Sequence, residues 1–167
     1  MAELLPQERL QPSLLDRLTD DTPESKEEAR DKRVLNLTQL RASVMRDVSW
    51  LLNTVHLQAS QDLSAWPEAA TSTINYGIPD LAGSTALSRN TLLLERAVRQ
   101  AVLNFEPRIL ADSLKVAVRV EPEQMDRHAM VFIIEGKLWA QPLPLSLYLK
   151  TELDLETGAV TIAESSR

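Results

Sequence analysis

The residues that could carry out chemistry are mostly carboxylates in this sequence. Its 24 acidic residues could supply the two carboxylates that glycosidic cleavage requires, one of them with a raised pKa. Most of these acids lie in charged stretches that we expect to be solvated, and the aromatic residues that would stack on sugar rings make up only 4% of the chain. The composition therefore disfavours a glycosidase.

The other residue types that hold metals or phosphates, or act as nucleophiles, are scattered or absent. The two histidines, His56 and His128, lie in unrelated segments, without a second histidine at i+4 or a cluster of carboxylates. The four glycines are isolated and there is no cysteine, so the chain has neither a phosphate-binding glycine loop nor a thiol nucleophile. The sequence predicts no metal site, no cofactor and no enzymatic activity.

One short charged motif, Glu106-Pro107-Arg108, follows a segment that we expect to be helical. An acid at this position faces the negative end of the helix dipole, where a cation would be favoured by about 0.3 to 1 kcal/mol. Pro107 fixes the direction of Glu106 relative to Arg108, so we expect the pair to project as a rigid, oppositely charged corner. Two interpretations stay open. The pair is a salt bridge within the domain, or it contacts a partner to which Arg108 offers a bidentate fork.

Two segments have apolar residues at the spacing of an amphipathic helix. From 34 to 57 these residues recur every three or four positions, and from 90 to 105 they form a second stripe that Pro107 stops. Arg41 falls inside the first stripe, where it either extends past the edge of the core or meets a carboxylate. Arg46 points to the opposite side of the same helix.

In the second half of the chain the apolar period changes from helical to two. Alternation predicts strands over 114–120, 145–154 and 159–163, and the segment 130–139, apolar on both sides, predicts a central strand. Helices followed by strands predict an α+β fold, in which two main amphipathic helices pack on a small antiparallel sheet of about four strands. An open sheet edge is either an aggregation hazard that charged side chains reduce, or a docking site for a strand of another chain.

The remaining segments are an N-terminal extension and a central loop. Residues 1–32 are polar and extended, with one short helical island at 13–18 whose apolar edge must dock on the chain itself or on a partner. Residues 33–167 are expected to form a single α+β domain. Between the two main helices, we expect a short helix at 68–74 and an ordered loop at 75–81, which is rich in residues that set special backbone angles.

Charge and composition narrow the partners and the location. The formal net charge is −6 and no Lys/Arg cluster is interleaved with aromatic residues, so nucleic acids and anionic membranes are poor partners. Nothing demands an oxidising compartment, the start does not resemble a signal peptide, and no apolar run approaches the roughly 18 residues of a membrane span. We expect a cytoplasmic protein without direct membrane contact.

Four motifs in sequence order resemble those of one protein family. They are Arg41-x-x-Val44-x-Arg46-Asp47 followed by Leu51-Leu-Asn-Thr54, Asn75-Tyr-Gly-Ile-Pro-Asp-Leu81, Phe105-Glu-Pro-Arg108, and the N-terminal Ser13-Leu-Leu-Asp-Arg-Leu18. In order and spacing they are similar to TssE, a baseplate subunit of type VI secretion systems. Val55 departs from an arginine expected in that family, and Ile109 from its usual leucine.

The resemblance implies a structural role in a contractile injection machine. TssE is similar in turn to a wedge protein of phage baseplates, long labelled lysozyme-like. The resemblance implies assembly with TssF, TssG and TssK, contact with the first ring of the contractile sheath, and a sheet edge that accepts strands of the sheath proteins TssB and TssC. It also implies a baseplate docked at the inner membrane through other proteins. The alternative is a muramidase that cleaves peptidoglycan.

Three groups of residues are therefore candidate partner-binding sites. The family associates its Glu-Pro-Arg corner with contacts that hold the baseplate together, and we add the neighbouring loop and the apolar edge of the N-terminal island. The candidates are Glu106, Pro107, Arg108, Asn75, Tyr76, Gly77, Pro79, Asp80, Leu14, Leu15 and Leu18. No residue is assigned a catalytic or metal-binding role.

Overall fold

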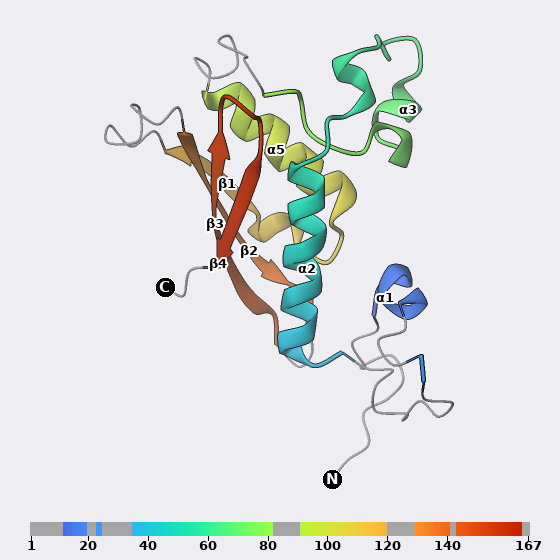
Figure 1. Cartoon of the computed structure of the whole chain (residues 1–167), viewed down its shortest axis with the longest axis vertical. Helices are drawn as coiled ribbons and strands as arrows, with labels where there is room; N and C mark the ends of the chain where they lie inside the picture. The colour runs from blue at the N-terminus through green and yellow to red at the C-terminus, as the bar shows by residue number, and fades with distance from the viewer. Residues whose placement is uncertain are drawn as a thin grey trace.

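Two long helices and a four-stranded antiparallel sheet dominate the fold (Figure 1). The computed structural model describes residues 12–19, 23–24, 35–81, 91–119, 129–140 and 143–164. Within these ranges there are four α-helices, of which two are long. This is the α+β fold that the sequence predicted.

The main helices form where the apolar stripe is continuous and end where it is interrupted. α2 spans Leu37–Leu52 and is capped by Asn36, whose side chain accepts from the Gln39 N–H at 2.8 Å while the Gln39 side chain accepts from the Asn36 N–H. α5 spans Thr91–Phe105 and ends before Pro107. Both helices were predicted, although α2 is shorter at both ends than expected. No helix among the described residues combines the length and the apolar character that crossing a bilayer requires.

Several short helical elements surround α2. α1 spans Leu14–Leu18, and α3 spans Pro67–Ala70. Single 3-10 turns occupy Leu57–Ala59, Thr73–Asn75 and Ala111–Ser113. In Figure 1, α1 lies beside α2, whereas α3 lies beyond the C-terminal end of α2. The predicted short helix at 68–74 is therefore split between α3 and the turn that follows it.

The strands follow one another in the sheet in chain order. They are β1 (Lys115–Arg119), β2 (Ala129–Leu138), β3 (Leu145–Asp154) and β4 (Val160–Glu164), and all neighbours pair antiparallel. β2 lies between β1 and β3, and its first six residues are all buried, which confirms that it is an inner strand.

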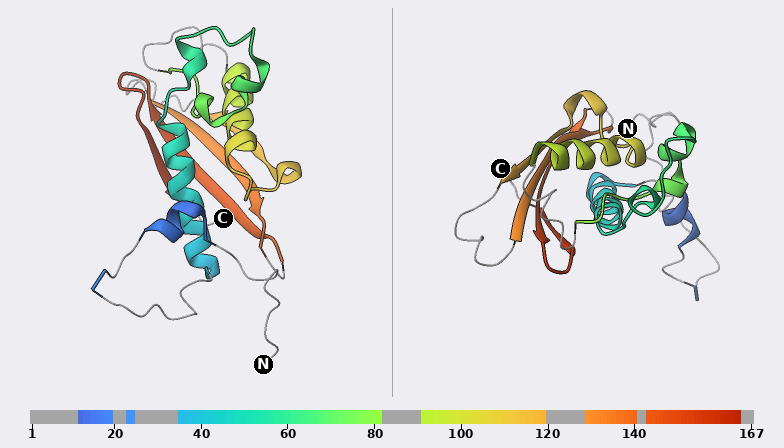
Figure 2. Two further views of the ribbon diagram at one scale, coloured as in Figure 1. Left: turned by 90° about the vertical axis from the view of Figure 1, so that its right-hand side faces the viewer. Right: turned by 90° about the horizontal axis from the view of Figure 1, so that it is seen from above.

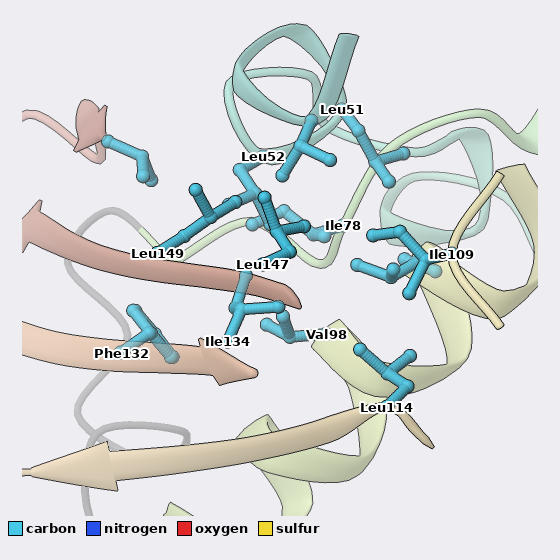
Figure 3. Close-up of a cluster of buried hydrophobic side chains, with 14 of the residues drawn as sticks. Leu51, Leu52, Ile78, Val98, Ile109, Leu114, Phe132, Ile134, Leu147 and Leu149 are labelled. Atoms are coloured by element: carbon cyan, nitrogen blue, oxygen red, sulfur yellow. The ribbon is translucent and has the colours of Figure 1, made fainter. Parts of the chain in front are cut away.

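The hydrophobic core lies between one face of the sheet and the two main helices, which cover that face together (Figure 2). Figure 3 shows side chains from helices and strands meeting there. Fully buried members include Val44, Val48, Leu51, Leu94, Val98, Val102, Ile134, Leu149 and Leu153. Burying each of the larger side chains contributes about 1.5 to 3 kcal/mol. Thr151 is also fully buried, and its hydroxyl donates to the Phe132 carbonyl at 3.2 Å, so its polar group is satisfied.

The two outer strands differ in what lies against their backbones. On β1, the Val118 N–H donates to the Glu95 carboxylate of α5 at 2.8 Å. The Glu95 side chain therefore takes up an N–H group that an added strand would need for pairing at that edge. β4 forms the other edge and lies against α2.

Candidate functional site

Arg108 is the centre of a network of hydrogen bonds and ion pairs just after α5. Its Nε donates to one carboxylate oxygen of Glu106 at 2.7 Å and its Nη2 donates to the other, so the two side chains form a bidentate pair. The same guanidinium donates to the Asp47 carboxylate and, at 3.1 Å, to the Ser43 hydroxyl. Asp47 and Ser43 share one face of α2 because they are four residues apart. The network thus joins the end of α5 to the middle of α2.

Burial makes this network a strong constraint on the fold. Glu106 is 3% exposed, while the side chains of Arg108 and Asp47 keep 21% and 23% of their surface. Burial by itself would lower the pKa of Arg108, but hydrogen bonds to Glu106 and Asp47, together with their negative charges, raise that pKa above its usual value. Arg108 therefore stays protonated and compensates two carboxylates at once.

Pro107 gives the corner its shape. The Glu106 N–H still donates to the Val102 carbonyl at 2.9 Å, as in a helix, but Pro107 has no N–H with which to continue. The Ile109 N–H then donates to the Glu106 carbonyl at 3.1 Å and closes a tight turn. Pro107 is exposed at the tip of this turn, and Arg108 folds back towards Glu106.

The pair was expected to project as a charged corner, but the Glu106 carboxylate is buried. The carboxylate turns inward because Arg108 compensates the charge and because the Arg108 N–H also donates to it at 3.1 Å. The exposed part of the corner consists of Pro107 and the outer side of Arg108. The salt bridge within the domain is present, and a contact between this corner and a partner stays a prediction.

Tyr76 links the neighbouring loop to the same network. Its hydroxyl donates to the Asp47 carbonyl at 3.3 Å, and its ring meets Phe105 edge to face with the centroids 5.2 Å apart. Burial raises the pKa of Tyr76, and the negative charges of Asp47 and Glu106 raise it further. The hydroxyl therefore stays protonated as a hydrogen-bond donor at neutral pH.

Asn75 and Gly77 hold the loop from the inside. The Asn75 side chain, in a residue that is 5% exposed, accepts from the Gln58 N–H and donates to the Ala70 carbonyl, both at 2.9 Å. Gly77 has a φ of 127°, and a Cβ at this position would lie 2.3 Å from the Thr54 carbonyl oxygen. Both residues fix the path of the backbone.

Pro79 and Asp80 lie on the outer side of the loop. They line a cavity of about 290 Å³ between the end of α2 and the turn that joins β3 to β4, which Val55 and Gly158 also line. Asp80 is exposed and Pro79 is half-buried. Of the predicted loop residues, these two are the ones that the fold leaves accessible at this cavity.

α1 is attached to the domain through its polar face. Ser13 caps it, and the Asp16 carboxylate accepts from the Arg46 guanidinium at 2.6 Å. Arg46 also contacts Asp47 at 2.7 Å and lies over the Trp50 ring, 5.0 Å from its centroid. Burial would raise the pKa of Asp16, but hydrogen bonds from Ser13 and Arg46 and the Arg46 charge lower it overall. The polar face of the island thus docks on its own chain.

The leucines of α1 are not used in this attachment. Leu14, Leu15 and Leu18 expose 71%, 44% and 74% of their surface, and no residue of α1 is buried. Their contact with a partner stays a prediction.

Sequence reasoning did not identify Ser43, Asp47 or Asp16 as members of these networks. Asp47 accepts from both Arg46 and Arg108, so charges of alternating sign run from α1 through α2 to the end of α5. The only local sign in the sequence that this part of α2 takes part in ion pairs was the adjacent Arg46 and Asp47 in the first motif. No local pattern could reveal a partner 61 residues away.

Metal binding and glycosidic cleavage each require a particular set of side chains. No group of three or more metal-binding side chains occurs within the described ranges, and His128 lies outside them. The fold brings the acids Asp47 and Glu106 together, but Arg108 binds both. A glycosidase needs a carboxylic acid that is free to donate a proton, in surroundings that favour its neutral form.

Comparison with known proteins gives a family model that matches more than half of the chain. Residues 38–143 match the family model described as baseplate wedge protein gp25. This segment contains the complete Arg108 network and the loop around Tyr76, but not α1. Neither the curated proteins nor the solved structures gave a match.

Proposed function

The chain belongs to the baseplate wedge protein gp25 family, which includes TssE of type VI secretion, and we propose that it is the TssE subunit of a type VI secretion baseplate. Family membership supports a structural role in a baseplate, in association with other baseplate proteins. The proposal adds that these partners are TssF, TssG and TssK. It also adds that the protein works in the cytoplasm and connects the baseplate to the first ring of the sheath.

The Arg108 network is the observation that best supports a scaffold. One guanidinium binds side chains on α2 and the carboxylate that follows α5, so the corner is held in one geometry before any partner arrives. A surface that is rigid in advance loses little conformational entropy on binding. The whole network also falls inside the segment that matches the family.

We assign different tasks to the candidate residues of the corner and the loop. Pro107, the outer side of Arg108, Pro79 and Asp80 are accessible and contact wedge subunits in this proposal. Glu106, Asn75, Tyr76 and Gly77 are supports, because their bonds and burial hold the accessible residues in place.

The exposed edge of α1 is a second contact surface for the wedge. Its three leucines are exposed, and the pair of Asp16 and Arg46 holds the helix at α2. An apolar face of this size gains stability by packing against another protein.

The connection to the sheath is proposed at β4. At the β1 edge Glu95 takes up the Val118 N–H, and β4 lies at the other edge of the sheet. An extended segment of TssB or TssC would pair there through backbone hydrogen bonds, which tolerate many side chains.

The test is affinity capture of the wedge. The chain is co-expressed with TssF, TssG and TssK, as wild type and with the double substitution Glu106→Ala/Arg108→Ala. The double variant removes the buried acid together with its cation, and Asp47 keeps its ion pair with Arg46, so no carboxylate of the network is left without a cation. Arg96→Ala, an exposed arginine on α5, is the matched control.

We expect wild type and the control to capture the wedge and the folded double variant to lose it. Equal capture by all three would move the interface to α1 or to the sheet edge. Absence of capture by wild type would contradict the proposed partners.

A further inference from the structure

Asn53, which directly follows α2, holds the backbone of one residue at the edge of the sheet. Its side-chain oxygen accepts from the Val160 N–H at 2.9 Å, and its side-chain nitrogen donates to the Val160 carbonyl at 2.9 Å. The same nitrogen donates to the Ser49 carbonyl at 2.9 Å, which fixes the amide against the last turn of α2. The amide fills both backbone positions of Val160 as a residue of a neighbouring strand would.

These contacts establish which way the backbone of β4 points. In an antiparallel strand, the N–H and C=O groups of successive residues point to alternate sides. Ala159, just before β4, accepts from the Asp154 N–H of β3 at 2.9 Å, so it points towards β3 and Val160 points outward. Ile162 and Glu164 lie two and four residues further along β4. Their backbone groups therefore also point outward.

The edge of β4 is closed at one position and open beyond it. Among the described residues, no side chain or loop bonds the outward backbone groups of Ile162, whereas Val160 is closed by Asn53. The outward backbone groups of Ile162 are therefore available to an added strand.

A second side chain of α2 bonds the backbone of the sheet in a similar way. Arg41 donates to the Ser146 carbonyl of β3 at 2.8 Å. The sequence predicted that Arg41 would extend past the core or meet a carboxylate, and the bond to a backbone carbonyl was not foreseen. Arg41 and Asn53 lie near the two ends of α2, so this helix fixes the sheet backbone at two separate places.

We infer that Asn53 sets the register of strand addition to β4, because it closes Val160 and makes an incoming strand begin its pairing at Ile162. This inference rests on the proposed connection to the sheath. The occupant is an extended segment of a sheath protein, recognised through its backbone N–H and C=O groups. Such recognition permits a strand to slide by two residues without changing its faces, and a fixed stop at one end prevents this.

The test uses the full chain and synthetic peptides that cover the terminal segments of TssB and TssC proteins. Amide hydrogen exchange at Val160 and Ile162 is followed by NMR with and without peptide, and the dissociation constant is measured by fluorescence anisotropy. In wild type, we expect the Val160 amide to be protected without peptide and the Ile162 amide only with it. In Asn53→Ala, the Val160 amide should lose its protection and regain it on binding. The Val160 N–H and carbonyl would then each form a hydrogen bond to the peptide, and these two bonds should lower the dissociation constant about tenfold.

Two further variants sharpen the result. In Asn53→Asp, the carboxylate still accepts from the Val160 N–H but cannot donate to its carbonyl, so we expect a gain in affinity of only about threefold. Asn36→Ala removes the cap at the other end of α2 and should leave the exchange pattern and the affinity unchanged.

Two outcomes would overturn the inference. In the first, the Val160 amide of Asn53→Ala stays unprotected in a complex that protects Ile162. In the second, no peptide protects Ile162 in any variant. The second outcome would remove the sheath contact from β4 and leave capture of the wedge, and with it the baseplate role, unaffected.

Discussion

The corner around Arg108 and the helix α1 are both attached to α2 by arginine–carboxylate pairs, yet they are held very differently. Arg108 binds three side chains and neutralises Glu106, which is 3% exposed. α1 has no buried residue and depends on the pair of Arg46 and Asp16, whose side chains are 34% and 14% exposed. Exposed pairs contribute little stability, whereas breaking a buried pair leaves an uncompensated charge. We therefore expect the corner to unfold only with the domain, and α1 to detach without unfolding it.

Arg108→Ala should have the largest effect on the fold. It leaves the buried Glu106 carboxylate without its cation, so we expect the free energy of unfolding to fall by about 2 to 4 kcal/mol in urea titrations. Glu106→Ala/Arg108→Ala should cost less than Arg108→Ala alone, because it removes the buried charge as well. A double variant less stable than the single one would show that the pair itself, rather than the unpaired acid, dominates.

Gly77→Ala should come next, because it strains the loop beside the corner. Its Cβ would meet the Thr54 carbonyl at a φ of 127°, and we expect a loss of about 2 to 3 kcal/mol in thermal unfolding. Gly158→Ala is the control in the turn between β3 and β4. With a φ of 73° it should cost only about 1 kcal/mol. Equal losses for the two variants would mean that the close approach to Thr54 is easily relieved.

Periodicity predicted the elements of the fold because helix and strand periods are local properties of the chain. The apolar stripe of α2, the proline after α5 and the alternation in β3 were each sufficient by themselves. The direction of Glu106 was not predictable, since it depends on the position of Arg108, which Ser43 and Asp47 hold and which periodicity cannot place. The docking of α1 was left open for the same reason, because the pair of Asp16 and Arg46 spans 30 residues.

Asp16→Asn should have a small global effect and a clear local one. The loss of one partly exposed ion pair should cost about 0.5 kcal/mol in overall stability. Limited proteolysis should cut near α1 faster than in wild type, because the helix loses its attachment to Arg46. Arg17→Ala, on the same helix, is the control. Unchanged cleavage in Asp16→Asn would show that other contacts hold α1.

Acid should reproduce this detachment in the wild type. The pKa of Asp16 is lower in the folded chain than its ordinary value of 3.8. Its contribution is therefore fully present above pH 3.8 and is lost as the pH falls through the lower folded value. Cleavage near α1 by an acid-active protease should rise in that window in wild type and stay constant in Asp16→Asn. Cleavage that rises equally in both proteins would assign the pH dependence to another group.

The central claim is that the domain holds a preformed corner whose exposed tip contacts the wedge, and Pro107→Lys tests it most directly. Pro107 is exposed and its side chain takes no part in the Arg108 network, so the variant should stay folded. The new charge and the loss of the proline at the turn should both act against the contact. Leu92→Lys, which changes an exposed residue at the opposite end of α5, is the matched control. In affinity capture with TssF, TssG and TssK, we predict that Pro107→Lys loses the wedge and that Leu92→Lys retains it. Capture by folded Pro107→Lys at the level of wild type would contradict the account.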